Sequence, residues 1–207
     1  MHLTAEQNAR RFFDTYVNKK NDSIKILEIG SYIGGFSIRS LANNNVEYIG
    51  VDLGQGPGVD IVLEDQYVLP FNDNSFDFVI SSSCFEHSEF FWLNFLEIMR
   101  VLKSDGLFYL NAPSGGLFHR YPVDCWRFFP DSGIALSNWG KRNNFNCDVL
   151  EQYTSDKDSD IWSDYVCVFI KDVSNVQKYE NRIIDSFNNF TNGSTYPNKI
   201  FKNILKW

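Results

Sequence analysis

Hydrophobic and polar positions change their period several times along the chain, and each change marks an expected element. Apolar residues at helical spacing predict helices over residues 5–18 and 89–103, and further helices are expected over residues 34–43 and from Asp131 onward. Short apolar or alternating runs predict strands. These runs cover residues 24–29, 46–52, 59–63, 76–83, 107–113, 145–154 and 162–173.

Strands that alternate with helices in this way imply right-handed crossover units. The expected fold is therefore α/β, with a doubly wound, mostly parallel seven-stranded sheet of the Rossmann-like type and helices on both faces. We expect residues 1–174 to form this domain, including the leading helix.

Residues 175–207 differ from the rest, because they are rich in asparagine and carry five Lys or Arg against two acidic residues. The end, "NKIFKNILKW", places apolar residues at helical spacing with lysines between them, so we expect a basic, helical C-terminal extension. Such a helix would pack on its own domain, or it would rest on a membrane surface or on another subunit.

Composition narrows the classes of function. The 207 residues are 43% apolar and 16% aromatic, which indicates a globular protein with a filled core. A net charge of −7 argues against a nucleic-acid partner, because such affinity comes largely from clustered Lys and Arg. No run approaches the roughly 20 apolar residues that span a bilayer, and no signal peptide is visible, so a cytoplasmic protein without a transmembrane segment is expected.

The four cysteines are irregularly spaced, with no C-x-x-C pair. They are Cys84, Cys125, Cys147 and Cys167. This spacing predicts reduced core thiols and no metal site.

Polar residues stand where the predicted strands end, which is where open parallel sheets bind ligands. Glu28 and Gly30 end the first strand, Asp52 ends the second, Asp65 follows the third, and the fourth runs into residues 81–87. A carboxylate at the end of the second strand can accept hydrogen bonds from both hydroxyls of a ribose, which indicates an adenosine ligand. The alternative is that Asp52 only caps the following turn.

The glycine-rich loop narrows the ligand further. Its spacing is G-x-x-x-G-G rather than G-x-G-x-x-G, Tyr32 takes the place of the middle glycine, and "GGFS" lacks the lysine of a P-loop. Ligands held by a diphosphate at this loop are therefore disfavoured.

Four blocks, in order, resemble the class I S-adenosylmethionine-dependent methyltransferases, and within them the type 11 branch. The blocks are "LEIGSYIGG", "YIGVDLGQGPGVDIV", "LPFNDNSFDFVISSSCFEH" and "EIMRVLKSDGLFYLNAPS". The resemblance covers about residues 24 to 130. A further stretch, "HRYPVDCWRFFPDSG", is similar to a block of bacterial members often found among surface-polysaccharide or glycan genes. The resemblance implies S-adenosylmethionine as cofactor and direct in-line methyl transfer, without metal, to a small-molecule or glycan-type acceptor.

By this resemblance, Gly30 and Gly34 let the backbone pass close to the cofactor. Glu28 orients the loop and reaches toward the amino group of the methionine part. Ser82, or its neighbour Ser81, supplies backbone beside the methionine end. Tyr32 departs from the family pattern, so its side chain must turn away from the cofactor or cover the site.

The adenosine part is assigned to three residues in the same way. Asp52 holds the ribose hydroxyls, Leu53 packs against the adenine ring, and Asp65 accepts a hydrogen bond from the adenine amino group. For Leu53, an ordinary place in the core is the alternative.

Methyl transfer to a hydroxyl needs a base, and we expect His87, with His119 as second candidate, to supply it. Glu86 and His87 could instead only start the next helix.

A polar and aromatic group in the long segment after residue 113 is expected to bind a sugar or another polar ring, or else to anchor that segment. Its members are Tyr121, Asp124, Trp126 and Arg127.

Two rival functions remain open at this point. A non-catalytic, methyltransferase-like binding protein fits Tyr32 and the lack of an unambiguous base. A nicotinamide-dependent nucleotide-sugar oxidoreductase is disfavoured, because Tyr32 blocks a second close glycine approach and no Tyr-x-x-x-Lys pair is present.

Overall fold

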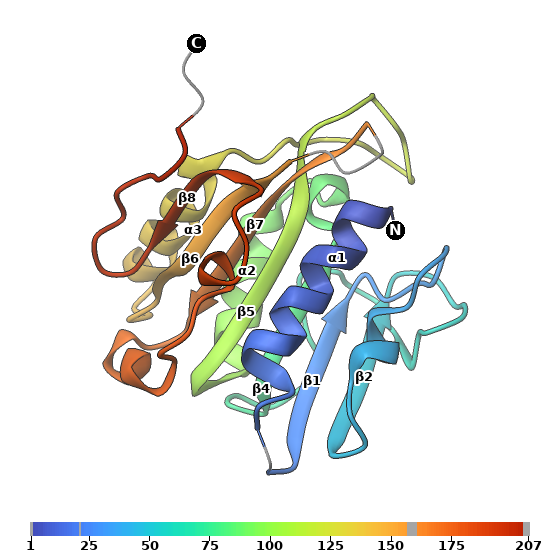
Figure 1. Cartoon of the computed structure of the whole chain (residues 1–207). Coiled ribbons are helices and arrows are strands. Elements are labelled where there is room, and N and C mark those ends of the chain that lie inside the picture. Colours follow the sequence, from blue (N-terminus) through green and yellow to red (C-terminus); the bar gives the residue numbers. More distant parts are fainter. Residues whose placement is uncertain (1, 21, 157–160, 205–207) are drawn as a thin grey trace.

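One eight-stranded sheet organises the chain, with the strand order β3-β2-β1-β4-β5-β7-β6-β8 (Figure 1). The computed structural model describes residues 2–20, 22–156 and 161–204. The expected α/β class is confirmed, and seven of the strands coincide with the predicted runs. The eighth strand corrects the predicted count and lies beyond residue 174.

Five neighbouring strands run parallel, as the crossover pattern predicts. Their bounds are β1 (Ile24–Ile29), β2 (Val46–Asp52), β3 (Ile61–Val62), β4 (Phe76–Ser82) and β5 (Leu102–Gly115). The carboxyl ends of these strands therefore meet at one edge of the sheet, where the chain leaves β1 and β4 next to each other.

The other side of the sheet is antiparallel. Here β7 (Ser163–Ile170) pairs with both β5 and β6 (Asp148–Ser155), and β8 (Phe190–Thr195) adds to the outer edge of β6. Every residue of β6 is buried, because β7 and β8 cover its two edges and helices or turns cover its faces.

Helices cover both faces of the sheet (Figure 1). On one face, α1 (Leu3–Phe12), which continues as a π-helical turn over Phe13–Val17, packs on β1, β4 and β5 through Ala9 and Phe12. On the opposite face, α2 (Phe91–Val101) and α3 (Pro130–Arg142) bury side chains such as Phe95 and Leu136. The predicted leading helix and the helices near residues 89 and 131 are confirmed.

The helix predicted over residues 34–43 is wrong. Only a short 3₁₀ helix, Ile38–Leu41, forms there, and Ile38 is buried on the α1 side of the sheet. Two glycines at the start and three asparagines at the end leave too few residues for a stable helical nucleus. The crossover between β1 and β2 is consequently a mostly irregular segment.

The helix predicted for the C-terminal extension is also wrong in its described part. Two 3₁₀ helices, Val173–Lys178 and Ile183–Asp185, lead into β8, and residues 196–204 are not helical. The free edge of β6 offers backbone hydrogen bonds to the β-prone "FTNGST", which local helical spacing cannot reveal. Residues 205–207, the end of the predicted helix, lie outside the described residues.

The cysteines are free thiols, and the prediction of core positions holds only for some of them. Cys147 and Cys167 are buried, Cys84 is partly covered, and Cys125 is exposed on the segment after β5. None of the helices in the described ranges is long and apolar enough to cross a membrane.

Candidate functional site

The turn after β1 is built so that only glycine fits at its first position. Gly30 has a φ of +78°, and a Cβ there would lie 2.6 Å from the Cβ of Cys84. The amide of Gly30 donates a hydrogen bond to the carbonyl of Val51, 3.0 Å away, which fastens the turn to β2. The glycine loop therefore lies directly against the residues that follow β4.

Asp52, at the end of β2, is tied to the glycine loop. Its Oδ2 accepts a hydrogen bond from the amide of Tyr32 at 3.0 Å, and its Oδ1 accepts from the amide of Leu53 at 2.7 Å. Oδ1 also accepts a longer hydrogen bond, of 3.4 Å, from the amide of Gly54. Two carboxylate oxygens offer about four acceptor positions, so capacity for a ligand hydroxyl is left.

Three other predicted cofactor residues face solvent near this edge. A Cβ at Gly34 would meet no heavy atom within 4 Å. Leu53 is 52% exposed, so the alternative of a core leucine is wrong. Asp65 is exposed and accepts a hydrogen bond from the amide of Tyr67 at 2.8 Å. All three are accessible to a ligand.

The ring of Tyr32 lies against the backbone of Gly56 in the loop between β2 and β3. A Cβ at Gly56 would lie 2.2 Å from Cε2 of Tyr32, and the tyrosine is 42% exposed. The backbone amide of Tyr32 therefore holds Asp52, while the ring covers the β2–β3 loop.

Glu28 lies on the α1 face of β1, the face shared by Ile24 and Ile26. Its Oε2 accepts a hydrogen bond from the hydroxyl of Tyr48 at 2.9 Å. Burial raises the pKa of Glu28 to about 7, although the Tyr48 hydrogen bond opposes this shift. Glu28 is thus a carboxyl group whose charge changes near neutral pH.

The end of β4 carries serine hydroxyls that are buried and lack a hydrogen-bond partner within the described ranges. They include Ser82 and Ser83, and Ser83 has a φ of +52°. Buried polar atoms are nearly always paired, so unpaired hydroxyls at a strand end are typical of a site that a ligand completes.

A cavity of about 250 Å³ opens beside these serines. It lies past the carboxyl ends of β4 and β5, and its walls come from four separate parts of the chain. The lining residues are His2, Ser83, Glu86, Pro113, His119 and Trp162. The Ser82–Glu86 segment thus joins the glycine loop to this cavity.

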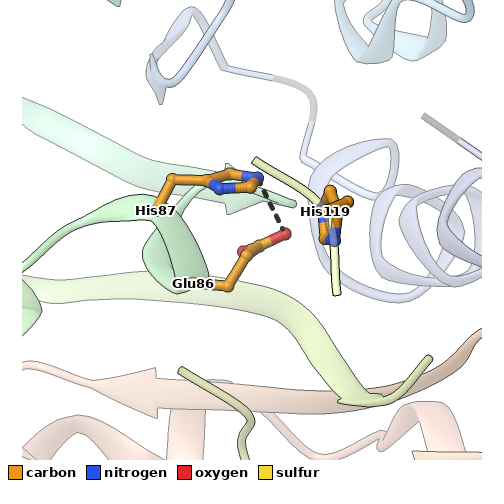
Figure 2. Close-up of side chains that lie close together, drawn as sticks. All are labelled: Glu86, His87 and His119. Carbon is orange, nitrogen blue, oxygen red and sulfur yellow. Dashed lines mark ion pairs between the residues drawn. The ribbon is translucent and has the colours of Figure 1, made fainter. Parts of the chain in front are cut away.

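Glu86, His87 and His119 come together at the cavity (Figure 2). His87 Nε2 lies 3.7 Å from Glu86 Oε1, and the two imidazole rings meet edge to face with centroids 5.0 Å apart. Glu86 is 1% exposed, and burial raises the pKa of its carboxyl group to about 8. Burial also lowers the pKa of His87, which favours the neutral imidazole.

Nδ1 of His87 donates a hydrogen bond to the carbonyl of Val123, which fixes the tautomer of the neutral ring. Nε2 then carries the lone pair and is the nitrogen that faces Glu86. Both catalytic candidates, His87 and His119, are therefore brought together by the structure.

The predicted acceptor-binding residues mainly anchor the segment after β5. Asp124 binds Arg127 through two hydrogen bonds, one of 2.8 Å, and this contact holds the pKa of the Asp124 carboxyl well below its usual range. Trp126 donates from Nε1 to the carbonyl of Ser88 at 2.9 Å. Tyr121, which is 70% exposed, lies at the surface of this segment.

Sequence reasoning missed four residues around the cavity: His2, Glu86 as a buried acid, Trp162 and Asp164. His2 Nε2 lies 2.8 Å from Oδ2 of Asp164, which is fully buried, and the ring of His2 stacks on Trp162. Asp164 sits within the apolar run of β7, and a carboxylate in a strand buried on both faces is a signal that could have been used.

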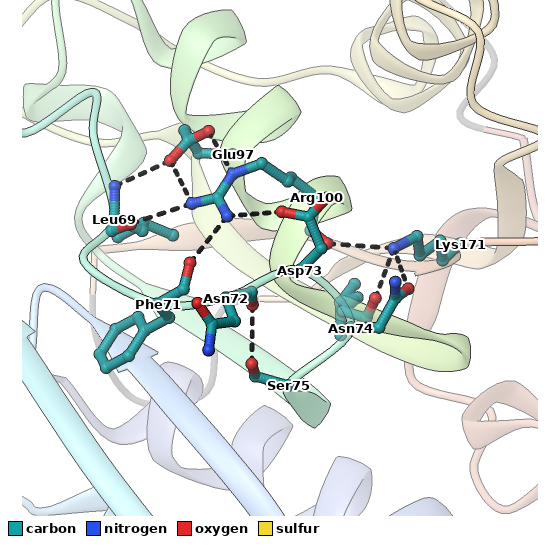
Figure 3. A network of polar contacts seen from close by, with 10 residues as sticks. Leu69, Phe71, Asn72, Asp73, Asn74, Ser75, Glu97, Arg100 and Lys171 are labelled. Atoms are coloured by element: carbon teal, nitrogen blue, oxygen red, sulfur yellow. Dashed lines mark hydrogen bonds and ion pairs between the residues drawn. The ribbon is translucent and has the colours of Figure 1, made fainter.

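The loop between Asp65 and β4 is held by a network around Arg100 of α2 (Figure 3). Arg100 donates to Glu97, to Asp73 and to the carbonyls of Leu69 and Phe71, at 2.7–2.9 Å. These contacts fix the segment that follows the predicted adenine-binding residue.

Comparison with known families supplies the deciding observation. Residues 27–110, from β1 to the middle of β5, match the family model of a methyltransferase domain, type 11. Over these residues, which make up less than half of the 207, the chain is similar to the type 11 branch of the class I methyltransferases. The predicted resemblance to this family and the predicted fold class are confirmed.

Curated relatives of the chain match over only part of their length. A phthiotriol/phenolphthiotriol dimycocerosates methyltransferase of Mycobacterium tuberculosis is 33% identical over 99 residues. The match covers 41% of the chain and 36% of the relative, so the chain spans about a third of the curated relatives it matches.

Solved structures share the fold at low identity. The 1,6-didemethyltoxoflavin-N1-methyltransferase of Burkholderia thailandensis, solved with its substrate and S-adenosylhomocysteine, has a TM-score of 0.61 and 13% identity, covering 81% of this chain and 78% of that one. The [4+2]-cyclase SpnF has a TM-score of 0.59 and 14% identity, covering 81% and 82%. A shared fold therefore does not by itself define the reaction.

Proposed function

We propose that the chain binds S-adenosylmethionine at the β1–β2 edge and transfers its methyl group to an acceptor in the cavity. The observation that carries the proposal is the continuity of the two sites. Gly30, fastened to β2, packs against Cys84, and two residues on Glu86 lines the cavity. A methyl donor at the loop and an acceptor in the cavity would therefore be neighbours.

The cofactor residues fit S-adenosylmethionine. Gly34 has open space where a ligand can approach, Asp52 has acceptor capacity for the ribose, and Leu53 offers an exposed apolar face for adenine. The buried hydroxyl of Ser82 has no hydrogen-bond partner within the described ranges, and the methionine end of the cofactor would supply one. Asp65 and Glu28 would contact the adenine amino group and orient the loop.

The bound cofactor supplies a methyl group activated by a sulfonium. The acceptor forms the new bond to the methyl carbon, the carbon–sulfur pair stays on sulfur, and the acceptor proton must leave. His87, neutral and with its Nε2 lone pair toward Glu86, accepts this proton in the metal-free protein. His119 is placed to orient the acceptor.

The acceptor is proposed to be a polar small molecule or one sugar unit of a glycan. Two histidines, Glu86 and Ser83 offer hydrogen bonds, and Trp162 offers an aromatic face. The cavity is smaller than the roughly 300 Å³ of common ligand pockets, so a small group or the end of a larger chain fits best. Tyr121, Asp124, Trp126 and Arg127 would shape the rim of the cavity.

A cytoplasmic location and contacts of the C-terminal tail with a membrane or a second subunit remain predictions.

The test is isothermal titration of the full chain with S-adenosylhomocysteine, followed by labelled S-adenosylmethionine with a panel of sugars and small polar compounds. Binding of the product and labelling of an acceptor are expected. Absence of product binding together with binding of a nicotinamide dinucleotide would overturn the proposal. Product binding with no labelled acceptor would favour the non-catalytic binding protein.

A further inference from the structure

One carboxyl oxygen of Glu86 is buried without a hydrogen-bond partner among the described residues. Its side chain is 1% exposed, and Oε2 has no hydrogen-bond partner within the described ranges. Burying a carboxylate oxygen without a partner is costly, so such atoms usually mark a place where something else binds. The side chain lines the cavity and lies beside the imidazoles of His87 and His119, which contact each other edge to face (Figure 2).

We propose that Glu86, His87 and His119 bind one divalent transition-metal ion, for which Zn²⁺ is the probe. One ligand atom from each residue lies within 4.8 Å of the other two. Two imidazoles and one carboxylate form a ligand set that divalent zinc, cobalt, nickel, manganese and iron accept, whereas calcium and magnesium prefer oxygen alone. This proposal departs from the expectation, drawn from cysteine spacing and family resemblance, that no metal is bound.

Both histidines are already oriented in the way that metal ligands usually are. Nδ1 of His87 donates to the carbonyl of Val123. Nδ1 of His119 lies 3.3 Å from the carbonyl of Leu117 and 3.4 Å from Oδ2 of Asp124. Metal-binding histidines almost always place the second ring N–H on a carbonyl or carboxylate, which leaves the other nitrogen for the metal. In both residues that nitrogen is Nε2.

The spacing is close to that of a bound ion. Ligand atoms around a tetrahedral Zn²⁺ lie about 3.4 Å apart for bonds of about 2.1 Å. Nε2 of His87 and Oε1 of Glu86 are 3.7 Å apart. The widest separation in the group, 4.8 Å, needs a closure of roughly 1.4 Å. His119 can supply this movement, because its side chain is 36% exposed on the irregular segment after β5.

Three protein ligands leave a position open toward the cavity, as in catalytic zinc sites. The role of this position in the reaction rests on the proposed function. A hydroxyl acceptor in that position would have a lowered pKa, so that its proton could leave to water before its oxygen bonds to the methyl carbon. In the metal-bound protein, His87 therefore acts as a ligand rather than as the base.

The experiment uses the full chain without an affinity tag, first stripped of metal by a chelator that is then removed. Zn²⁺ is titrated calorimetrically, and Co²⁺ is followed by its visible absorption. One ion should bind per chain, and Glu86→Gln, His87→Ala and His119→Ala should each raise the dissociation constant at least tenfold. His2→Gln, which removes the remaining histidine of the sequence, should leave the affinity within about threefold.

Thermal unfolding and S-adenosylhomocysteine titration of each variant separate the possible outcomes. The inference is overturned if Zn²⁺ does not bind, or if it binds the three variants as tightly as the unmodified chain. Glu86→Gln keeps the shape of the side chain and so guards against a result caused by misfolding. If Zn²⁺ binds but S-adenosylhomocysteine does not, the proposed function is wrong and the metal site stands. If S-adenosylhomocysteine binds but Zn²⁺ does not, only the metal site is wrong.

Discussion

The backbone amide of Tyr32 donates a hydrogen bond to Oδ2 of Asp52, 3.0 Å away, and so joins the glycine loop to the end of β2. The residue that departs from the family pattern thus holds the proposed ribose-binding acid through its main chain. This contact does not depend on the tyrosine ring, which lies against Gly56. The site can therefore keep the loop in place without a middle glycine.

Asp52→Asn is expected to weaken S-adenosylhomocysteine binding at least tenfold, about 1.4 kcal/mol, in calorimetric titration. Asparagine keeps one oxygen for the Tyr32 amide but loses the charge and the second acceptor oxygen. Glu64→Gln is the matched control, because Glu64 is exposed nearby and loses the same charge. Unchanged affinity in Asp52→Asn would show that the ribose assignment is wrong.

Gly34→Val separates ligand contact from folding. A Cβ at this position meets only open space within 4 Å, so the free energy of unfolding should stay within about 0.5 kcal/mol of the unmodified protein. If the cofactor approaches the backbone here, S-adenosylhomocysteine affinity should fall at least tenfold, and Gly34→Ala should have a smaller effect. Calorimetry and chemical denaturation measure the two quantities. Retained affinity in the valine variant would place the ligand elsewhere.

The raised pKa of Glu28 predicts that the protein loses stability as the pH rises through neutrality. Its pKa is about 7 in the folded protein, above the ordinary value of 4.5, so burial disfavours the ionised form. Its protonated form contributes stability in full below pH 4.5, and this contribution is lost as the pH rises through 7. Glu28→Gln lacks this loss, so its stability relative to the unmodified chain should rise by about 3 kcal/mol between pH 4.5 and 8.

Urea denaturation at several pH values measures this difference. Glu47→Gln, which changes a half-exposed carboxylate on the neighbouring strand β2, serves as control and should follow the pH profile of the unmodified protein. Parallel profiles for Glu28→Gln and the unmodified chain would contradict the buried, protonated Glu28.

Arg100→Met tests the network behind the loop that follows Asp65 (Figure 3). The substitution leaves the carbonyls of Leu69 and Phe71 without their donor, and a loss of about 2 kcal/mol is expected. The melting temperature should fall by roughly 4–8 °C. Lys103→Met removes a single, partly buried ion pair with Asp77 and leaves no backbone carbonyl without a donor, so it should cost less than about 1 kcal/mol. Equal effects of the two variants would refute the importance of the network.

The parallel half of the sheet could be predicted from the sequence, because each of its strands is a local apolar run bounded by turn residues. The end of the first strand at Gly30 could also be predicted, whereas the left-handed φ of this glycine is a finding of the structure. The helix predicted over residues 34–43 failed for a local reason, its flanking glycines and asparagines, whereas the C-terminal extension failed where long-range contacts decide the structure. The edge of β6 recruits residues 190–195 as β8, and no local spacing indicates that partner.

The site was predictable in its residue types but not in its geometry. His87 and His119 are 32 positions apart, and only the anchoring of the segment after β5 by Asp124 and Arg127 brings their rings together. Glu86 could not be recognised as buried, because its burial depends on Cys125 and Trp126, whose amides both donate to its carbonyl. His2 reaches the cavity only because α1 packs across the sheet.

The strand β8 protects the protein as well as extending its sheet. It covers the outer edge of β6, whose buried carboxylate Glu151 also accepts hydrogen bonds from the amides of Ile183 and Ile184, at 2.9 and 3.2 Å. A chain shortened to the predicted boundary at residue 174 would lose these partners and leave the backbone groups along the outer edge of β6 unpaired. Such an edge pairs readily with the same edge of another molecule. The C-terminal residues thus shield this edge, and a chain trimmed at residue 174 is expected to associate with other copies of itself.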